Sequence, residues 1–207
     1  DGIDRLVIDV SLNTGGMAEN VFYTLDYLTD KPVDITYTYL ITDECRETAK
    51  NNVDRSPYLS EADREYMMHY IDSVPDGIRF RTDTARRMRY LPQRPTHGYD
   101  GEVYVLTSHQ TYSAAQMFAR YCQVLGVGKV AGQHCGGYNA VTGNAARVEL
   151  PVSRWMQFQV PFREEVISPD DEPYAYPTMD IPIEHPFEEW LHRENRSLER
   201  LLRMIEE

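Results

Sequence analysis

Ser113 stands where a serine could serve as a nucleophile, at the junction of a strand and a helix. The sequence predicts a strand over Glu102–Thr107, a turn over Ser108–Tyr112 and a helix over Ser113–Leu125. The first backbone N–H groups of a helix have no partner within it, and the helix dipole adds to their attraction for negative charge. A serine at this position therefore lies beside groups that can stabilise an anion.

A second turn with the same property follows the first predicted strand. The apolar run in Arg5–Leu12 predicts that strand, and Asn13-Thr14-Gly15-Gly16 is a turn that leads into a helix. If the two strands are neighbours, the amide of Gly15 or Gly16 and the amide of Ala114 form an oxyanion hole. The acyl group in that hole would be attacked by Ser113, and one such donor is typically worth on the order of 10² to 10³ in rate. The helix after the turn has apolar residues at helical spacing: Met17, Val21, Leu25 and Leu28.

The same serine also fits a purely structural role. Ser113-Ala114-Ala115-Gln116 is a capping box, in which the serine hydroxyl satisfies the first turn of the helix. The turn lacks the G-x-S-x-G pattern of an α/β-hydrolase, since Thr111 and Ala115 occupy the two glycine positions. The pattern alone favours the cap over the nucleophile and disfavours an α/β-hydrolase.

Composition places the chain among globular proteins and excludes two classes. Its 207 residues are 42% hydrophobic and 26% charged, and no stretch has the length and apolar character of a membrane span. The 21 Lys and Arg residues against 33 Asp and Glu residues leave a net charge of −12, which opposes binding to a phosphate backbone. We therefore expect no nucleic-acid partner and no membrane span in this chain.

The cysteines and histidines show neither a disulfide framework nor a metal pattern. Cys45, Cys122 and Cys135 form no C-x-x-C pair, and a packed thiol explains Cys135 better than a nucleophile does. Four histidines lack the spacing of metal ligands: His69, His97, His185 and His192. No phosphate-loop or dinucleotide motif is present, so we expect no metal and no cofactor.

The segment between the two turns is expected to be a lid or insertion over residues 42–100. A strand is predicted before it over Val33–Ile41, and a helix within it over Ser60–Asp72, where capping residues begin the helix. Its later part is crowded with arginines, namely Arg79, Arg81, Arg86, Arg87, Arg89 and Arg94. We favour a solvated loop or an intramolecular partner for the acidic surface over a carboxylate-binding rim.

After the serine helix, the sequence predicts a strand over Lys129–Ala131 and a glycine-rich loop over Gly132–Gly143 that is functional or strained. An antiparallel pair follows, with apolar positions at Val148, Leu150, Met156, Phe158 and Val160. One amphipathic C-terminal helix is indicated by Phe187, Trp190, Leu191, Leu198, Leu201 and Ile205. The predicted fold class is therefore α/β. Because the chain begins at Asp1 without an initiator methionine or signal peptide, we expect further sequence upstream.

Five segments carry a likeness to a known family, and they occur in the family's order. They are Leu6–Gly16, Val103–Thr107, Thr111–Gln116, Val130–Gln133 and Tyr176–Ile181. Together they resemble the C-terminal processing (tail-specific) serine protease family, whose relatives include the tricorn core and the interphotoreceptor retinoid-binding protein repeats. The resemblance covers most of residues 5–41 and 101–183 and leaves 42–100 unmatched.

The resemblance implies a crotonase/ClpP-like core of strand-turn-helix units with an inserted helical lid. Residues 1–207 would then be a single protease-core domain, the C-terminal part of a longer protein. The implied activity is that of a serine endopeptidase with an acyl-enzyme at Ser113 and oxyanion donors at Gly15, Gly16 and Ala114. A polypeptide is the implied substrate, and the family's habit implies a periplasmic or otherwise exported protein.

The resemblance leaves the general base open. In the bacterial members a lysine lies in the glycine-rich loop, and counting from the serine segment puts Tyr138 at that place. A tyrosine with the ordinary pKa of about 10 is a poor acceptor of the serine proton at neutral pH.

Three alternatives to a lysine stay open. In the tricorn-like arrangement the base is a histidine upstream of Asp1, and the acid stands near Asp171 or Glu172. His134 in the glycine-rich loop, or His109 in the serine turn, is a second candidate for the base. The third alternative is a catalytically inactive domain that binds peptides or other ligands. An acyl-CoA enzyme of the crotonase fold ranks last, since it needs no hydroxyl at Ser113.

Overall fold

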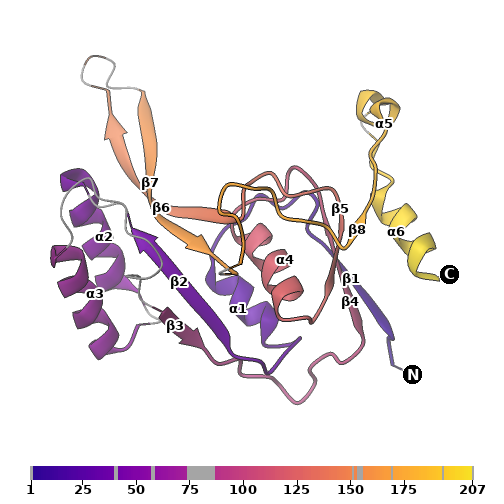
Figure 1. Cartoon of the computed structure of the whole chain (residues 1–207), viewed down its shortest axis with the longest axis horizontal. Coiled ribbons are helices and arrows are strands. Elements are labelled where there is room, and N and C mark those ends of the chain that lie inside the picture. Colours follow the sequence, from indigo (N-terminus) through magenta and orange to yellow (C-terminus); the bar gives the residue numbers. More distant parts are fainter. Residues whose placement is uncertain are drawn as a thin grey trace. The chain divides into compact units, whose positions relative to one another are not determined.

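The computed structural model of the chain describes residues 2–39, 42–56, 59–73, 87–150, 152, 156–168, 170–192 and 194–206. Helices and strands are mixed along the chain, which confirms the predicted α/β class. The chain divides into two compact units (Figure 1). Unit 1 consists of residues 1–35, 88–141 and 166–207, and unit 2 of residues 36–87 and 142–165. Both turns singled out by the sequence lie in unit 1.

Unit 1 is built on a parallel sheet with the order β1-β4-β5-β8. Its strands are β1 (Arg5–Asp9), β4 (Glu102–Thr107), β5 (Lys129–Gly132) and β8 (Ile181–Pro182). The register sets Asp9 beside Leu106 and Thr107 beside Gly132, so the carboxyl ends of β1, β4 and β5 meet at one edge. In open parallel sheets this edge is where ligands bind.

Both faces of this sheet are covered by helices. Successive side chains of β4 point to opposite faces and are buried on each, as is usual for parallel sheets. Helix α4 (Ala114–Val124) packs on β4 and β5, and α1 (Glu19–Leu25) packs on α4. The other face carries α6 (Ser197–Glu206), whose Leu201 is fully buried against the strands. The start of α4 is therefore fixed to the edge where the strands end.

The second sheet has the order β3-β2-β7-β6, with β2 (Val33–Tyr39) antiparallel to β7. Its other strands are β3 (Arg87–Tyr90), β6 (Ala140–Glu149) and β7 (Gln157–Val166). Unit 2 also holds α2 (Asp43–Arg55) and α3 (Glu61–Ser73), which pack together through Cys45, Ala49, Val53, Met67 and Ile71. The Oγ of Ser60 accepts the N–H of Asp63 at 3.2 Å, which confirms the predicted helix cap.

Several sequence expectations need correction. Helix α2 was not predicted, and β3 lies in a stretch expected to be irregular. Met17 is 63% exposed and precedes α1, so it does not belong to the apolar stripe of that helix. Arg79, Arg81 and Arg86 lie outside the described residues. Arg89 pairs with Asp34, and Arg94 pairs with Asp100.

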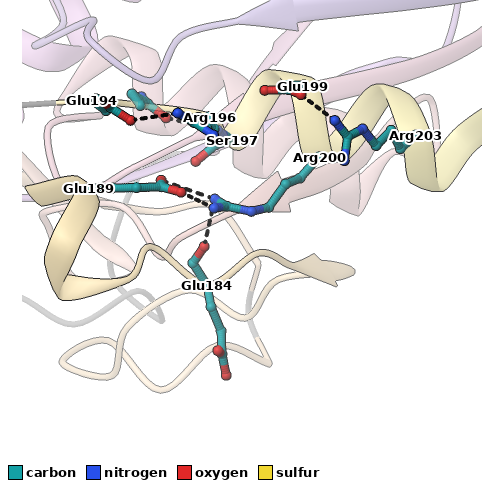
Figure 2. A network of polar contacts seen from close by, with 9 residues as sticks. Glu184, Glu189, Glu194, Arg196, Ser197, Glu199, Arg200 and Arg203 are labelled. Atoms are coloured by element: carbon teal, nitrogen blue, oxygen red, sulfur yellow. Dashed lines mark hydrogen bonds and ion pairs between the residues drawn. The ribbon is translucent and has the colours of Figure 1, made fainter.

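The predicted C-terminal helix is two helices, α5 (Phe187–His192) and α6, because Asn195 starts a new helix by accepting the N–H of Ser197 at 3.0 Å. Arg200 of α6 binds the carboxylate of Glu189 on α5 through two N–H groups, one at 3.1 Å. Figure 2 shows this pair and the third contact of Arg200, to the backbone carbonyl of Glu184 at 3.2 Å. Among the described residues, every helix is too short or too polar to cross a membrane.

Candidate active site

The turn after β1 is organised by Asn13. Its side-chain oxygen accepts the N–H of Gly15 at 2.9 Å, and its own N–H donates to Val10 at 3.0 Å. This is an Asx-turn, in which a side chain replaces a backbone partner. The amide of Gly15 is therefore occupied, whereas that of Gly16 has no acceptor among the described residues. The sequence left Gly15 and Gly16 as equal candidates for an oxyanion donor, and only Gly16 has a free amide.

Gly15 packs directly on the serine turn. A Cβ at this position would lie 2.6 Å from the Cβ of Ser113 and 2.7 Å from the carbonyl oxygen of Tyr112, so no other residue fits. Its φ of +99° also disfavours any residue with a side chain. The N–H of Tyr112 donates to the carbonyl of Asn13 at 3.1 Å. The two turns thus touch, as the pairing of β1 with β4 requires.

Ser113 has a strained backbone and a free hydroxyl. Its φ is +50° and its ψ −125°, and no other non-glycine residue in the described part of the chain has a positive φ. The side chain makes no capping hydrogen bond. Gln116, the partner that a capping box requires, instead donates to the carbonyl of Tyr138. The capping interpretation is therefore wrong, and residues held in sparsely populated conformations concentrate at functional sites.

The amide of Ala114 lies beside this serine at the start of α4. It has no acceptor among the described residues, and it would be 3.0 Å from a Cβ placed on Gly15. Because Gly15 has no side chain, the space in front of this amide stays clear. A substrate oxygen can approach the start of α4 there, where the helix dipole favours negative charge.

Two hydroxyls that the sequence did not single out join the turns. Thr111 is fully buried, and its Oγ1 donates to the carbonyl of Val10 at 2.9 Å. Ser108 donates through Oγ to the carbonyl of Ser11 at 2.5 Å. These bonds tie the serine turn to the end of β1 across about a hundred residues of sequence, and the motif offers no signal for them.

The glycine-rich loop after β5 lies against the serine turn. Its Gln133 and Gly136 amides donate to the carbonyls of Thr107 and Thr111 at 3.1 and 2.9 Å. A Cβ on Gly136 would lie 3.2 Å from the ring of Tyr112. It would also clash with the carbonyl oxygen of His109, so the absence of a side chain lets the loop approach the serine turn this closely. The loop was expected to extend to Gly143, but β6 already begins at Ala140.

Aromatic rings from three segments form a connected surface next to the serine turn. Ring centroids are 4.2 Å apart for His109 and His134, 4.3 Å for His134 and Tyr176, and 5.0 Å for Tyr176 and Tyr138. The set that we call the aromatic surface is His109, Tyr112, His134, Tyr138, Tyr174 and Tyr176. Its four tyrosines are 46–54% exposed. The surface can therefore contact a ligand through ring faces.

The side chains of Tyr138 and Tyr176 are joined by a hydrogen bond. The charge that Tyr138 can carry and the hydrogen bond between the two side chains both raise the pKa of Tyr176. A phenol with a raised pKa stays protonated at neutral pH, so little phenolate is present to accept a proton. Tyr176 is therefore a poor acceptor for the proton of Ser113, and its hydrogen bond also engages the side chain of Tyr138.

Two histidines lie in the aromatic surface. Nδ1 of His134 is 2.8 Å from the carbonyl oxygen of Cys135, so Nδ1 donates and Nε2 keeps its lone pair. Burial lowers the pKa of His109, and the charges that His134 and His185 can carry lower it further, against a hydrogen bond to the backbone of His134 that raises it. The lowered pKa favours a neutral ring for His109 at pH 7.

The two candidate acids differ in what they bind. Asp171 forms a two-bond ion pair with Arg120, with Nε to Oδ2 at 2.9 Å, and the side chains are only 10% and 16% exposed. Glu172 is exposed, and its backbone carbonyl accepts from the side chain of Asn139 at 3.0 Å and from the N–H of Ala175 at 3.1 Å. The carboxylate of Asp171 is therefore engaged by Arg120, whereas the contacts of Glu172 among the described residues are made by its backbone carbonyl and leave its carboxylate available.

The chain's three lysines all have other partners. Lys31 donates to the carbonyl of Leu125 at 2.6 Å, and Lys50 pairs with Asp72. Lys129 lies 5.9 Å from the centre of the Tyr104 ring. No lysine of this chain stands at the serine.

Cys135 is buried, and burial raises the pKa of its thiol to about 12. The thiolate needed for nucleophilic attack is therefore scarce. The described residues contain no group of three or more His, Cys, Asp or Glu side chains that could hold a metal ion. An open depression of about 500 Å³ adjoins the glycine turn and is lined by Asp9, Ser11, Leu12, Asn13 and Thr14.

Comparison with known proteins gives a consistent result. The model of peptidase family S41 matches residues 1–160. Among solved structures, the fold is similar to a protein from Parabacteroides merdae assigned as a peptidase, with a TM-score of 0.57 and 15% identity, covering 97% of this chain and 51% of that one. Mature CPAF matches with a TM-score of 0.58 and 15% identity, covering 86% of this chain and 39% of that one. The photosystem II D1 C-terminal processing protease matches with a TM-score of 0.52 and 14% identity, covering 88% of this chain and 35% of that one. No curated protein sequence matches.

The chain belongs to peptidase family S41, a family of serine peptidases. It spans about a third to a half of the length of the solved structures named above.

Proposed function

We propose that this protein is a serine endopeptidase that cleaves peptide bonds through an acyl-enzyme at Ser113. The observation that carries the proposal is the uncapped hydroxyl of Ser113 on a strained backbone, in contact with the turn of Gly15. A helix-start serine that served only as a cap would use its oxygen for the first turn. Here the backbone of Ser113 is strained, and its hydroxyl caps no helix amide and so is available to react.

In this proposal the amides of Gly16 and Ala114 stabilise the oxyanion of the tetrahedral intermediate. Both lack an acceptor among the described residues, and both belong to turns that touch. Gly15 contributes space in place of a hydrogen bond, because its own amide binds Asn13. Preorganised donors of this kind act only on the charge that develops during reaction.

The proposed general base is a histidine supplied from upstream of Asp1, with Glu172 as the acid that orients it. Glu172 is preferred over Asp171, since Asp171 is engaged by Arg120. His134 is the alternative base within this chain, because its Nε2 lone pair is unused by the bond to Cys135. A carboxylate beside a catalytic histidine fixes the tautomer that can accept a proton.

The proposed substrate is a polypeptide. The aromatic surface next to Ser113 offers rings to a substrate, since its four tyrosines are 46–54% exposed. Ring faces bind apolar and aromatic side chains of a substrate well. The net charge of −12 makes an anionic ligand an unfavourable alternative.

By the same likeness, we propose a crotonase/ClpP-like core in a single protease-core domain over residues 1–207. Residues 42–100 would be its inserted lid, and the protein would be tail-specific and periplasmic or otherwise exported. The supporting observation is the parallel sheet of unit 1, in which β1 and β4 lead through turns into helices.

A catalytically inactive peptide- or ligand-binding domain is the second candidate. Tyr138 favours it, since a tyrosine replaces the lysine base and all three lysines are engaged elsewhere. The candidate predicts binding without turnover.

The two candidates are separated by incubating the full-length protein with a reduced, unfolded polypeptide and following fragments by mass spectrometry. The peptidase predicts fragments with the wild type and none with Ser113→Ala, while both proteins bind the polypeptide. If neither protein produces fragments but both bind, the inactive binding domain is the better account. Equal cleavage by both would exclude Ser113 as the nucleophile.

A further inference from the structure

Three polar side chains form a stripe along the otherwise apolar helix α4. Gln116, Arg120 and Gln123 are four and three residues apart, so they share one face, and Ser113 begins that face one turn earlier. Apart from Val124, which is exposed, the rest of the helix is buried, including Ala115, Met117, Phe118, Ala119 and Cys122. We call Gln116, Arg120 and Gln123 the α4 stripe.

Each member of the α4 stripe binds a segment that lies beside the serine helix. Gln116 donates to the carbonyl of Tyr138 in the glycine-rich loop. Gln123 donates to the carbonyl of Thr178 at 3.2 Å and to the carboxylate of Asp180 at 3.0 Å. The stripe thereby connects the helix that Ser113 begins to residues from two other parts of unit 1.

Arg120 is the central member and makes the strongest contacts. Its guanidinium binds both carboxylate oxygens of Asp171 and also donates to Gln123 at 2.5 Å. Both partners of the ion pair are largely shielded from water, at 16% and 10% exposure. Two parallel N–H···O bonds set the position and also the orientation of the carboxylate, which lysine cannot reproduce.

The segment that Arg120 holds carries groups of the proposed site. We call residues 171–180 the acid loop. Glu172 follows Asp171 directly, and Tyr176 reaches the ring of His134. The loop is also bonded to the start of β6, because the N–H groups of Asn139 and Ala140 donate to Ala175 and Pro173 at 2.8 and 2.7 Å. A shift of Asp171 would therefore displace Glu172 and the aromatic surface together.

We propose that Arg120 is a positioning residue for the serine site. Its ion pair with Asp171 sets the acid loop against the helix that begins at Ser113, so that Glu172 and Tyr176 keep a fixed distance from the serine. Arg120 acts through Asp171 and does not touch the substrate. This inference rests on the proposed function, since a position matters only if Ser113 reacts.

The test compares Arg120 with a matched ion pair elsewhere in unit 1. Arg200 also binds one carboxylate through two N–H groups, with side chains 32% and 12% exposed, and it lies on α6 (Figure 2). Full-length wild type, Arg120→Met, Arg120→Lys and Arg200→Met are reacted with a fluorophosphonate probe from pH 6 to 9. Hydrogen exchange of residues 171–180 and the melting temperature are measured on the same samples.

The expected result is a labelling rate about tenfold to a hundredfold lower in Arg120→Met, because displacements near 1 Å have effects of this size. Arg120→Lys restores part of the rate, and Arg200→Met stays within about twofold of wild type at temperatures where all variants are folded. Residues 171–180 exchange faster only in the Arg120 variants. The pH profile of labelling also changes in Arg120→Met, because displacement of the acid loop disturbs Glu172.

Equal labelling rates in Arg120→Met and Arg200→Met would overturn the positioning role. If the wild type takes no label at all, the proposed function fails instead, and hydrogen exchange then tests by itself whether Arg120 anchors the acid loop. Unchanged exchange of residues 171–180 in Arg120→Met would contradict that anchoring.

Discussion

Among single residues, Gly15 packs directly against the proposed nucleophile. A methyl group there meets the Cβ of Ser113 and the carbonyl oxygen of Tyr112 at distances that atoms do not adopt. The serine turn would have to move away from the turn of Gly16 to make room. In the proposed oxyanion hole, the amide of Ala114 would then be displaced relative to the amide of Gly16.

The first prediction concerns Gly15→Ala, with Gly126→Ala as its control. Both glycines have a positive φ, but a Cβ at Gly126 would meet only Lys31 Nζ at 3.9 Å. Each variant should lose about 1–2 kcal/mol of stability from the backbone conformation alone, and Gly15→Ala more because of the clash. Labelling by the fluorophosphonate should fall by about a hundredfold in Gly15→Ala and remain near the wild-type rate in Gly126→Ala. A fully reactive Gly15→Ala protein would contradict the proposed oxyanion geometry.

Single residues differ in how far the sequence could predict them. Ser113 and the glycine turn could be found, because strand, glycine and serine stand in local patterns. The capping box was misleading, since Gln116 finds its partner in Tyr138 on another loop. The pair of Arg120 and Asp171 joins residues 51 positions apart, and no local pattern signals it. The hydroxyl contacts of Thr111 and Ser108 depend on strand pairing in the same way.

At the scale of elements, the strands and the serine helix were predicted best. β4 matches its predicted bounds, and α4 ends near Gly126 as expected, because apolar periodicity and a glycine stop agree there. Helix α2 was missed because its buried face consists of the small or short side chains Cys45, Ala49 and Val53, which give a weak pattern. The C-terminal stripe was taken as one helix, although Asn195 is a capping residue that could have shown the break.

A second prediction tests the packing of α2 against α3. Ile71 is fully buried in this contact, so Ile71→Ala should cost about 2–5 kcal/mol through lost contacts and a cavity. Ile3→Ala is the control, since Ile3 is exposed and its truncation should change stability by no more than about 0.5 kcal/mol. Hydrogen exchange resolved to residues 43–55 and 61–73 measures the difference. Equal exchange in both variants would show that the two helices do not stabilise each other.

For the whole molecule, the net negative charge and the family membership indicate the kind of partner to expect. The charge of −12 and the membership of peptidase family S41 both favour a polypeptide over a nucleic acid as the partner. The sequence could not identify the general base, because the position of the family's lysine holds Tyr138. The proposed histidine lies outside residues 1–207, so activity should depend on sequence beyond this chain.

The central claim is that Ser113 is an activated nucleophile in the full-length protein. The most direct measurement is the intact mass of the full-length wild type and Ser113→Ala after reaction with a fluorophosphonate, beside a protein of residues 1–207 alone. One adduct on the full-length wild type, none on Ser113→Ala and little on residues 1–207 is the predicted result, and it also places the base upstream. A full-length wild type without an adduct, or a Ser113→Ala protein labelled as fast as the wild type, would contradict the account.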